Sequence, residues 1–200
     1  MGRIGQTLAV VWLISRTASG QEPPDAWDWA GAVQDDAWAK LKVSVSGFVP
    51  ASPDEWSVTV IAGDGWGRTG EFRLWKPFRG AASVAYVRTV GDNLLGQLHA
   101  LREKTPDLAV ESAISVLDVR KGGLAADQCP GLTSLATRFQ NIRIPVLPEG
   151  YLALHAPGYS VTVSPANRGE RQYSVDANEN DLARWCARLQ ETVQRCERAR

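Results

Sequence analysis

The chain of 200 residues contains little histidine and little cysteine, and its charges cancel. The 22 acidic and 22 basic residues leave no net charge. Because nucleic-acid binding requires a strongly basic surface, we expect no nucleic-acid partner. The two histidines and three cysteines show neither the HExxH nor the paired CxxC spacing of zinc sites, and no acidic calcium loop is present. The sequence therefore predicts no metal site.

Long apolar runs are missing as well. The run from Leu8 to Ile14 has seven residues, too few to cross about 30 Å of hydrocarbon, and we expect no transmembrane span. Its position after Arg3, with small residues from Ala18 to Gly20 behind it, is instead typical of a signal peptide. We predict that residues 1–20 are removed and that residues 21–200 form a single domain, secreted or periplasmic. An amphipathic first helix of the domain is the alternative interpretation.

All three cysteines follow the predicted leader, and export to an oxidising compartment favours a disulfide between two of them. Cys186 and Cys196 lie on one predicted helix. Ten residues of helix separate their Cα atoms by about 15 Å, beyond the ~7 Å limit for a bridge. Cys129 is therefore one partner. If its helix packs antiparallel to the last helix, Cys129 meets Cys196, the pairing we predict over Cys129–Cys186. Cys186 is then a buried, inert thiol.

Hydrophobic periodicity predicts a mixture of helices and strands. A 3.6-residue period predicts helices over residues 25–41, 93–104, 129–139 and 180–197. Alternation predicts strands over residues 43–45, 56–60, 71–75, 83–90, 113–119, 142–146, 151–155, 159–163 and 172–176. Runs of strands joined by hairpin-length connections favour an α+β fold, with a mainly antiparallel sheet and helices packed on one face.

The two halves of the predicted domain, residues 25–108 and 109–200, share an order of elements. The strand sequence WSVTV from Trp56 to Val60 matches YSVTV from Tyr159 to Val163. Each of these strands follows a helix and a strand, enters a glycine-containing hairpin and leads towards a leucine-rich helix. Two related helix–strand–hairpin–helix halves are one interpretation. The other is that alternating serine, valine and threonine is a common composition for half-buried strands.

Few residues suggest catalysis. The string from Gly65 to Gly70 fits the GxGxxG pattern of dinucleotide sites. An alternating strand follows it where a helix should begin, so we interpret it as a hairpin loop and expect no cofactor. His155, Ser160 and Asp176 are the residue types of a hydrolytic triad. No GxSxG or SxxK motif supports that triad, and a strand-end histidine bonded to backbone is the favoured interpretation of His155.

Tryptophan is abundant, and seven of the eight tryptophans follow the predicted leader. Trp66 lies between two glycines at the tip of a predicted hairpin, where few neighbours can bury it. Trp27 and Trp29 flank an aspartate near the start of the domain. Exposed indoles beside charged side chains suit stacking against sugar rings or anchoring of a protein partner. We therefore predict that Trp66, Trp27 and Trp29 are binding residues.

Together these features favour an exported, non-catalytic protein that binds a protein or glycan partner in the cell envelope. A secreted hydrolase that uses His155 with Ser160 and Asp176 is the second hypothesis. A purely structural envelope protein is the third.

Overall fold

The computed structural model describes residues 25–48, 56–142, 157–165, 169–176 and 180–200. The predicted signal peptide (residues 1–20), the predicted strand at residues 151–155 and most of that at 142–146 lie outside the described residues. Helices and strands follow one another in the order α1 (Ala26–Val43), β1 (Trp56–Gly63), β2 (Arg68–Lys76), β3 (Ser83–Thr89), α2 (Leu94–Lys104), α3 (Val110–Val116), β4 (Val119–Ala125), α4 (Gly131–Phe139), β5 (Gly158–Ser164), β6 (Arg171–Asp176) and α5 (Asp181–Arg198).

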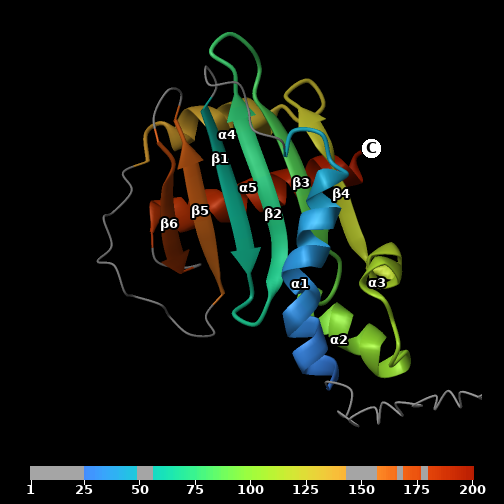
Figure 1. Ribbon diagram of the computed structural model, residues 1–200. Coiled ribbons are helices and arrows are strands. Elements are labelled where there is room, and N and C mark those ends of the chain that lie inside the picture. Colours follow the sequence, from blue (N-terminus) through green and yellow to red (C-terminus); the bar gives the residue numbers. More distant parts are fainter. Residues whose placement is uncertain (1–24, 49–55, 143–156, 166–168, 177–179) are drawn as a thin grey trace, which may run out of the picture.

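The strands form one sheet in the order β4-β3-β2-β1-β5-β6, and each neighbouring pair is antiparallel. The predicted α+β class with a mainly antiparallel sheet is therefore confirmed. Strands β1, β2 and β3 are consecutive neighbours, as expected for hairpin connections. The later strands flank this meander on both sides, with β4 beyond β3 and the β5–β6 hairpin beyond β1 (Figure 1).

One face of the sheet packs against α4 and α5, which cross behind the strands in Figure 1. Because side chains alternate along a strand, Val58 and Val60 of β1 and Val161 of β5 point to this face. The side of α5 that meets them is mainly apolar. Its buried residues are Leu182, Ala183, Trp185, Cys186, Leu189, Thr192 and Val193.

The opposite face carries the other three helices, α1, α2 and α3, which pack over Ala85 and Val87 of β3. The prediction that helices pack on one face is therefore wrong. The apolar run from Val84 to Val87 explains the difference, because a strand with no polar alternation is typical of burial on both faces. Val84 and Tyr86 join the cluster under α4 and α5, whereas Ala85 and Val87 join the cluster under α1 to α3.

Two predicted strands are helical. Of residues 43–45, Val43 ends α1 and the other two lie in the turn that follows it. Residues 113–119 lie mostly in α3, which ends at Val116. The strand comes after it, as β4, and contains the paired glycines Gly122 and Gly123. Glycine weakens a strand, so propensity alone missed β4. In the sheet Gly122 lies opposite Tyr86, and a Cβ on Gly122 would stand 3.3 Å from the phenol oxygen. The Tyr86 ring covers the place of the missing side chain.

The matched sequences WSVTV and YSVTV lie side by side, as neighbouring strands β1 and β5. In their antiparallel register Thr59 is opposite Thr162, and these two threonines occupy equivalent positions of the two sequences. The resemblance does not extend to the helices that follow. Helix α2 packs on one face of the sheet and α5 on the other. Among the described residues the likeness is seen in the strands, and the interpretation as two related halves stays a prediction.

The predicted disulfide is confirmed: Cys129 and Cys196 are bonded, with their Cα atoms 5.6 Å apart. It joins the turn before α4 to the last turns of α5, as antiparallel packing of these helices requires. Cys186 is free and buried, and burial raises the pKa of its thiol well above the ordinary value. Cys186 is therefore inert at neutral pH, because the nucleophilic thiolate is scarce and enclosed.

Candidate functional site

A hollow of about 340 Å³ opens to solvent where helix α1 meets the β1–β2 hairpin. Its wall includes Gln34 of α1, Ile61 of β1, Trp66 and Arg68 of the hairpin, and Ser160 of β5. Glycines form much of the remaining wall, so main-chain atoms face the hollow there. We call this feature the hairpin hollow. It brings together two residues singled out from the sequence for different reasons, Trp66 as a binding residue and Ser160 as a catalytic one.

The tip of the hairpin is held in shape by Asp64. One carboxylate oxygen of Asp64 accepts hydrogen bonds from the backbone N–H groups of Trp66 and Gly67, each at 3.0 Å. The other oxygen accepts one from the side-chain amide of Asn93 at 2.8 Å. Partial burial raises the pKa of this carboxyl, but the three hydrogen bonds outweigh it, and the net effect lowers the pKa. The tip is thus organised around an ionised aspartate.

The same asparagine fastens the tip to helix α2. Asn93 caps this helix, because its side-chain oxygen accepts a hydrogen bond from the backbone N–H of Gly96. Gly67 lies so close to Asn93 that a Cβ on Gly67 would be 2.7 Å from the side-chain oxygen of Asn93. Gly65 has a φ of 95°, which favours glycine. The glycines of the GxGxxG string therefore serve a hairpin tip, and the interpretation as a hairpin loop is confirmed.

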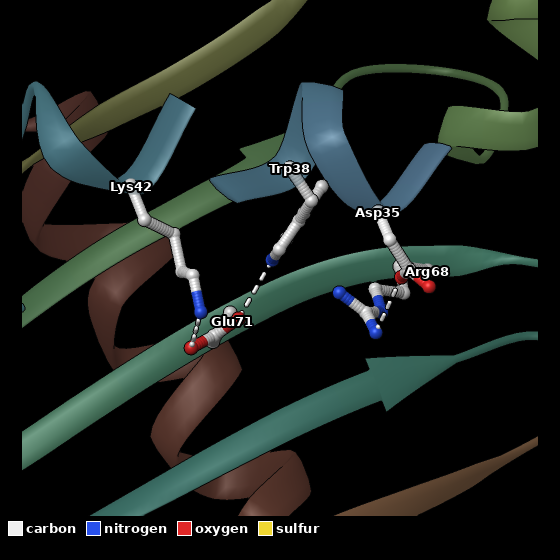
Figure 2. Close-up of polar contacts among 5 residues, drawn as sticks. All are labelled: Asp35, Trp38, Lys42, Arg68 and Glu71. Carbon is white, nitrogen blue, oxygen red and sulfur yellow. Dashed lines mark hydrogen bonds and ion pairs between the residues drawn. The ribbon is translucent and has the colours of Figure 1, made fainter. Parts of the chain in front are cut away.

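Helix α1 forms the second wall of the hollow and is tied to strand β2 by polar contacts (Figure 2). At the hollow itself, the carboxylate of Asp35 lies 2.9 Å from the guanidinium of Arg68. Further along the helix, the indole N–H of Trp38 donates to Glu71 at 2.7 Å, and the Lys42 ammonium lies 3.1 Å from the other oxygen of Glu71. These contacts fix α1, and with it Gln34, beside the hairpin.

Glu71 is nearly enclosed, with only 4% of its side chain exposed. A buried carboxylate is destabilising unless its charge and its lone pairs are matched. Here Lys42 supplies the charge and Trp38 a second donor, so the carboxylate is satisfied. Figure 2 shows both side chains reaching down from α1 to meet it. We infer a positioning role for this contact, because it ties α1 to β2 beside the hollow. Glu71 is the register partner of Ile61, which lines the hollow.

Trp66 is the most exposed tryptophan of the described residues, with 70% of its surface accessible to solvent. Trp66 lies on the hairpin tip that Asp64 and Asn93 hold in place. Its backbone is therefore fixed, whereas its ring is largely exposed to solvent. The predicted exposure of Trp66 at a hairpin tip is confirmed. Its binding role stays a prediction.

Polar side chains continue from the hollow along one face of the sheet. On the face that carries α1 to α3, none of the described helices packs over β1, β5 or β6. Alternation places Thr59, Ser160, Thr162 and Gln172 on this face, since their strand neighbours point into the core under α4 and α5. Across the register, Thr59 faces Thr162 and Thr162 faces Gln172. The hollow therefore adjoins a row of hydroxyl and amide groups.

The other two predicted binding residues lie at the beginning of α1. The ring of Trp27 stacks on His99 of α2 with centroids 3.7 Å apart, although 53% of Trp27 is exposed. Trp29 is half-buried, and the guanidinium of Arg102 lies 5.0 Å from its ring centroid. Both tryptophans thus contact α2 and help to join the two helices. They do not line the hairpin hollow, and their binding role is a prediction.

The residues of the predicted triad are only partly described. Ser160 lies on β5, and its hydroxyl accepts a hydrogen bond from the Gln172 amide at 3.0 Å. In the backbone ladder Asp176 pairs with Gly158, two positions from Ser160 along β5. His155 lies outside the described residues. The hydrolytic hypothesis therefore stays a prediction.

Sequence reasoning missed Gln34, Ile61 and Arg68 as parts of the hollow. Arg68 stands inside the GxGxxG string, and its charge beside Trp66 was an available signal. Gln34 and Ile61 reach the hollow only through tertiary packing. Among the described residues no three His, Cys, Asp or Glu side chains gather as a metal site would require. Within the same ranges no helix has the length and apolar character needed to cross a membrane.

Comparisons with protein-family models, with curated proteins and with solved structures find no match to this chain. Its function is therefore argued from the geometry of its own residues.

Proposed function

We propose that the chain is an exported, non-catalytic protein that binds a glycan of the cell envelope in the hairpin hollow. The observation that carries the proposal is Trp66, an exposed indole on a fixed hairpin tip at the rim of an open hollow. One face of a pyranose ring consists of C–H groups and can stack on an indole, while its hydroxyls need donors and acceptors. Aromatic surface combined with a few placed polar groups is the usual composition of a small-molecule site.

The polar groups beside Trp66 suit sugar hydroxyls. Arg68 and Gln34 offer donors at one side of the hollow, and the Ser160 hydroxyl and the Thr59–Thr162 row continue from the other. An open hollow that continues onto a row of polar strand side chains accommodates an extended oligosaccharide better than a compact metabolite. The glycan therefore lies along the sheet, with one ring on Trp66.

A glycan fits this surface better than a protein does. The centre of a protein interface is usually a cluster of apolar and aromatic side chains. Among the described residues the exposed large hydrophobic side chains are instead scattered, at Trp27, Val43, Trp66, Phe78 and Val116. Phe78 lies in the β2–β3 connection, at the opposite end of β2 from Trp66. Export is supported by the leader-like residues 1–20 and by the disulfide, which is typical of oxidising compartments.

The test is an oligosaccharide array that includes neutral hexoses, N-acetylhexosamines and uronic acids, followed by calorimetric titration of the best-bound oligosaccharide. We expect Trp66→Ala to weaken that affinity at least tenfold and Trp66→Phe to weaken it less. Phe78→Ala is the matched control, because it removes an even more exposed aromatic (86% exposed) at the other end of β2, and it should leave affinity unchanged.

Equal affinity of wild type and Trp66→Ala would contradict the proposal, as would an array without any binding. A protein captured by the wild type and lost in Trp66→Ala, with no glycan bound, would favour a protein partner at the same tryptophan. If neither a glycan nor a protein binds to the wild type, the purely structural hypothesis is favoured.

A further inference from the structure

A second hollow, of about 170 Å³, lies on the other face of the sheet, between the end of α4 and the beginning of α5. Its wall is dominated by arginine: Arg138 comes from α4, and Arg184 and Arg188 come from α5. Asp181 and Asn141 complete its polar surface. Residues 181, 184, 185 and 188 follow the spacing of one helix face, so the arrangement results from regular helical geometry.

The charges of the described residues that line this hollow do not cancel. Asp181 pairs with Arg184, with a carboxylate oxygen 2.6 Å from the guanidinium. Within the part of the chain that the structure describes, no carboxylate lies within 4.0 Å of the guanidinium groups of Arg138 and Arg188. Three arginines against one aspartate leave two positive charges in a chain whose formal net charge is zero. The excess of positive charge is therefore local to the hollow and does not reflect the overall composition of the chain.

The floor of the hollow is rigid. Trp185 lies in it with 3% of its surface exposed, and its indole N–H donates to the carbonyl of Leu135 on α4 at 2.9 Å. The Trp185 ring also packs against Phe139, with centroids 4.7 Å apart. The same pair of helices is closed by the Cys129–Cys196 disulfide at their other ends. These contacts fix the helix backbones from which the three exposed arginine side chains project.

We propose that this arginine hollow binds a phosphate monoester. Guanidinium groups match phosphate oxygens with paired hydrogen bonds, and a phosphate dianion balances the two uncompensated charges. The Asn141 amide donates one hydrogen to the carbonyl of Thr137 and keeps a second as a neutral donor. The first turn of α5 contributes a positive potential that favours an anion. A single carboxylate or sulfate ester leaves one charge unmatched. The ligand is therefore a phosphate group, presented by a soluble molecule or by a lipid headgroup.

The experiment measures binding of phenyl phosphate and phenyl sulfate to the full chain by calorimetry at constant ionic strength and pH 7.5. We expect phenyl phosphate to bind at least tenfold more tightly than phenyl sulfate. Its affinity should fall at pH 5, where the monoester loses its second charge. The double variant Arg138→Ala with Arg188→Ala should lose this preference. The matched control removes two exposed arginines elsewhere, Arg79 and Arg171, and should keep it.

Equal binding of the two esters, or an unchanged preference in the Arg138/Arg188 double variant, would overturn the proposal. Co-sedimentation with phosphatidylcholine vesicles that contain phosphatidic acid distinguishes the sources. Sedimentation that requires Arg138 and Arg188 assigns the site to a lipid headgroup, and absence of sedimentation assigns it to a soluble phosphate ester. Because the arginine hollow and Trp66 lie on different faces, failure of this proposal leaves the proposed glycan site unaffected.

Discussion

Replacing Lys42 by Met tests the idea that the buried carboxylate of Glu71 depends on its partners from α1. The change keeps the length and apolar stem of the side chain but removes the ammonium 3.1 Å from Glu71. Removing one partner of a fully buried ion pair destabilises a protein by about 3–5 kcal/mol. Lys42 is 32% exposed, so water can partly replace it, and we expect a loss of about 2–3 kcal/mol. For a chain of this length that loss lowers the melting temperature by about 4–12 °C.

A second variant, Glu71→Gln, separates charge from packing. It keeps an oxygen that can accept the hydrogen bond from Trp38 and removes the charge that needs Lys42. We expect it to destabilise by about 1–2 kcal/mol, since Lys42 can turn towards solvent. The double variant should be no less stable than Lys42→Met alone, because a neutral amide needs no cation. The two effects are then not additive, with a coupling free energy of about 1–2 kcal/mol.

The assay is urea unfolding with the disulfide intact. Lys40→Met is the matched control. Lys40 lies on the same helix, 41% exposed, and pairs on the surface with Asp36 and Glu111. Surface pairs contribute little, so this variant should be destabilised much less than Lys42→Met. Equal losses for Lys42→Met and Lys40→Met, or additive effects of Lys42→Met and Glu71→Gln, would refute the reasoning about Glu71.

Two further predictions concern the disulfide and the hairpin tip. Replacing both Cys129 and Cys196 by Ala should lower the free energy of unfolding by up to about 4 kcal/mol, because the bond closes a loop with a sequence separation of 67; a change below about 1 kcal/mol in urea unfolding would contradict this. The pKa of Asp64 is lowered in the folded state, so its stabilising effect is present above the ordinary carboxyl pKa and is lost as pH falls through the folded-state value. Wild type should therefore exceed Asp64→Asn in stability at pH 7, with the difference shrinking at pH 2.5. An equal difference at both pH values would argue against this account of the tip.

Local patterns in the sequence were sufficient for most individual elements and for the disulfide. The rise per residue excluded a bridge between Cys186 and Cys196, and antiparallel packing of two predicted helices then identified Cys129 and Cys196 as partners. Apolar alternation found β1, β5 and their neighbours, because one side of each packs against α4 and α5. Propensity failed at β4, where the ring of Tyr86 compensates for Gly122. That compensation depends on a partner strand and leaves no local signal.

The packing of helices on both faces of the sheet and the formation of the hairpin hollow depend on contacts between residues far apart in the sequence. Glu71 has the pattern of a solvent-facing strand residue, and only the position of α1 above β2 buries it. The hairpin hollow needs Ile61 and Ser160 to be register partners, which chain order does not reveal. The arginine hollow, in contrast, could have been predicted from the sequence. The antiparallel packing that predicts Cys129 next to Cys196 also brings Arg138, at the end of α4, to Arg184, near the beginning of α5.

The order of strands in the sheet has a consequence for how the molecule assembles. Strands β1, β2 and β3 are central, yet they are synthesised first, and both of their outer edges are completed by the later strands β4 and β5. Until those strands arrive, the meander presents two unpaired backbone edges, a template for association with other chains. Premature termination before β5 would leave the edge of β1 bare. Shortened chains of this protein should therefore aggregate through β1.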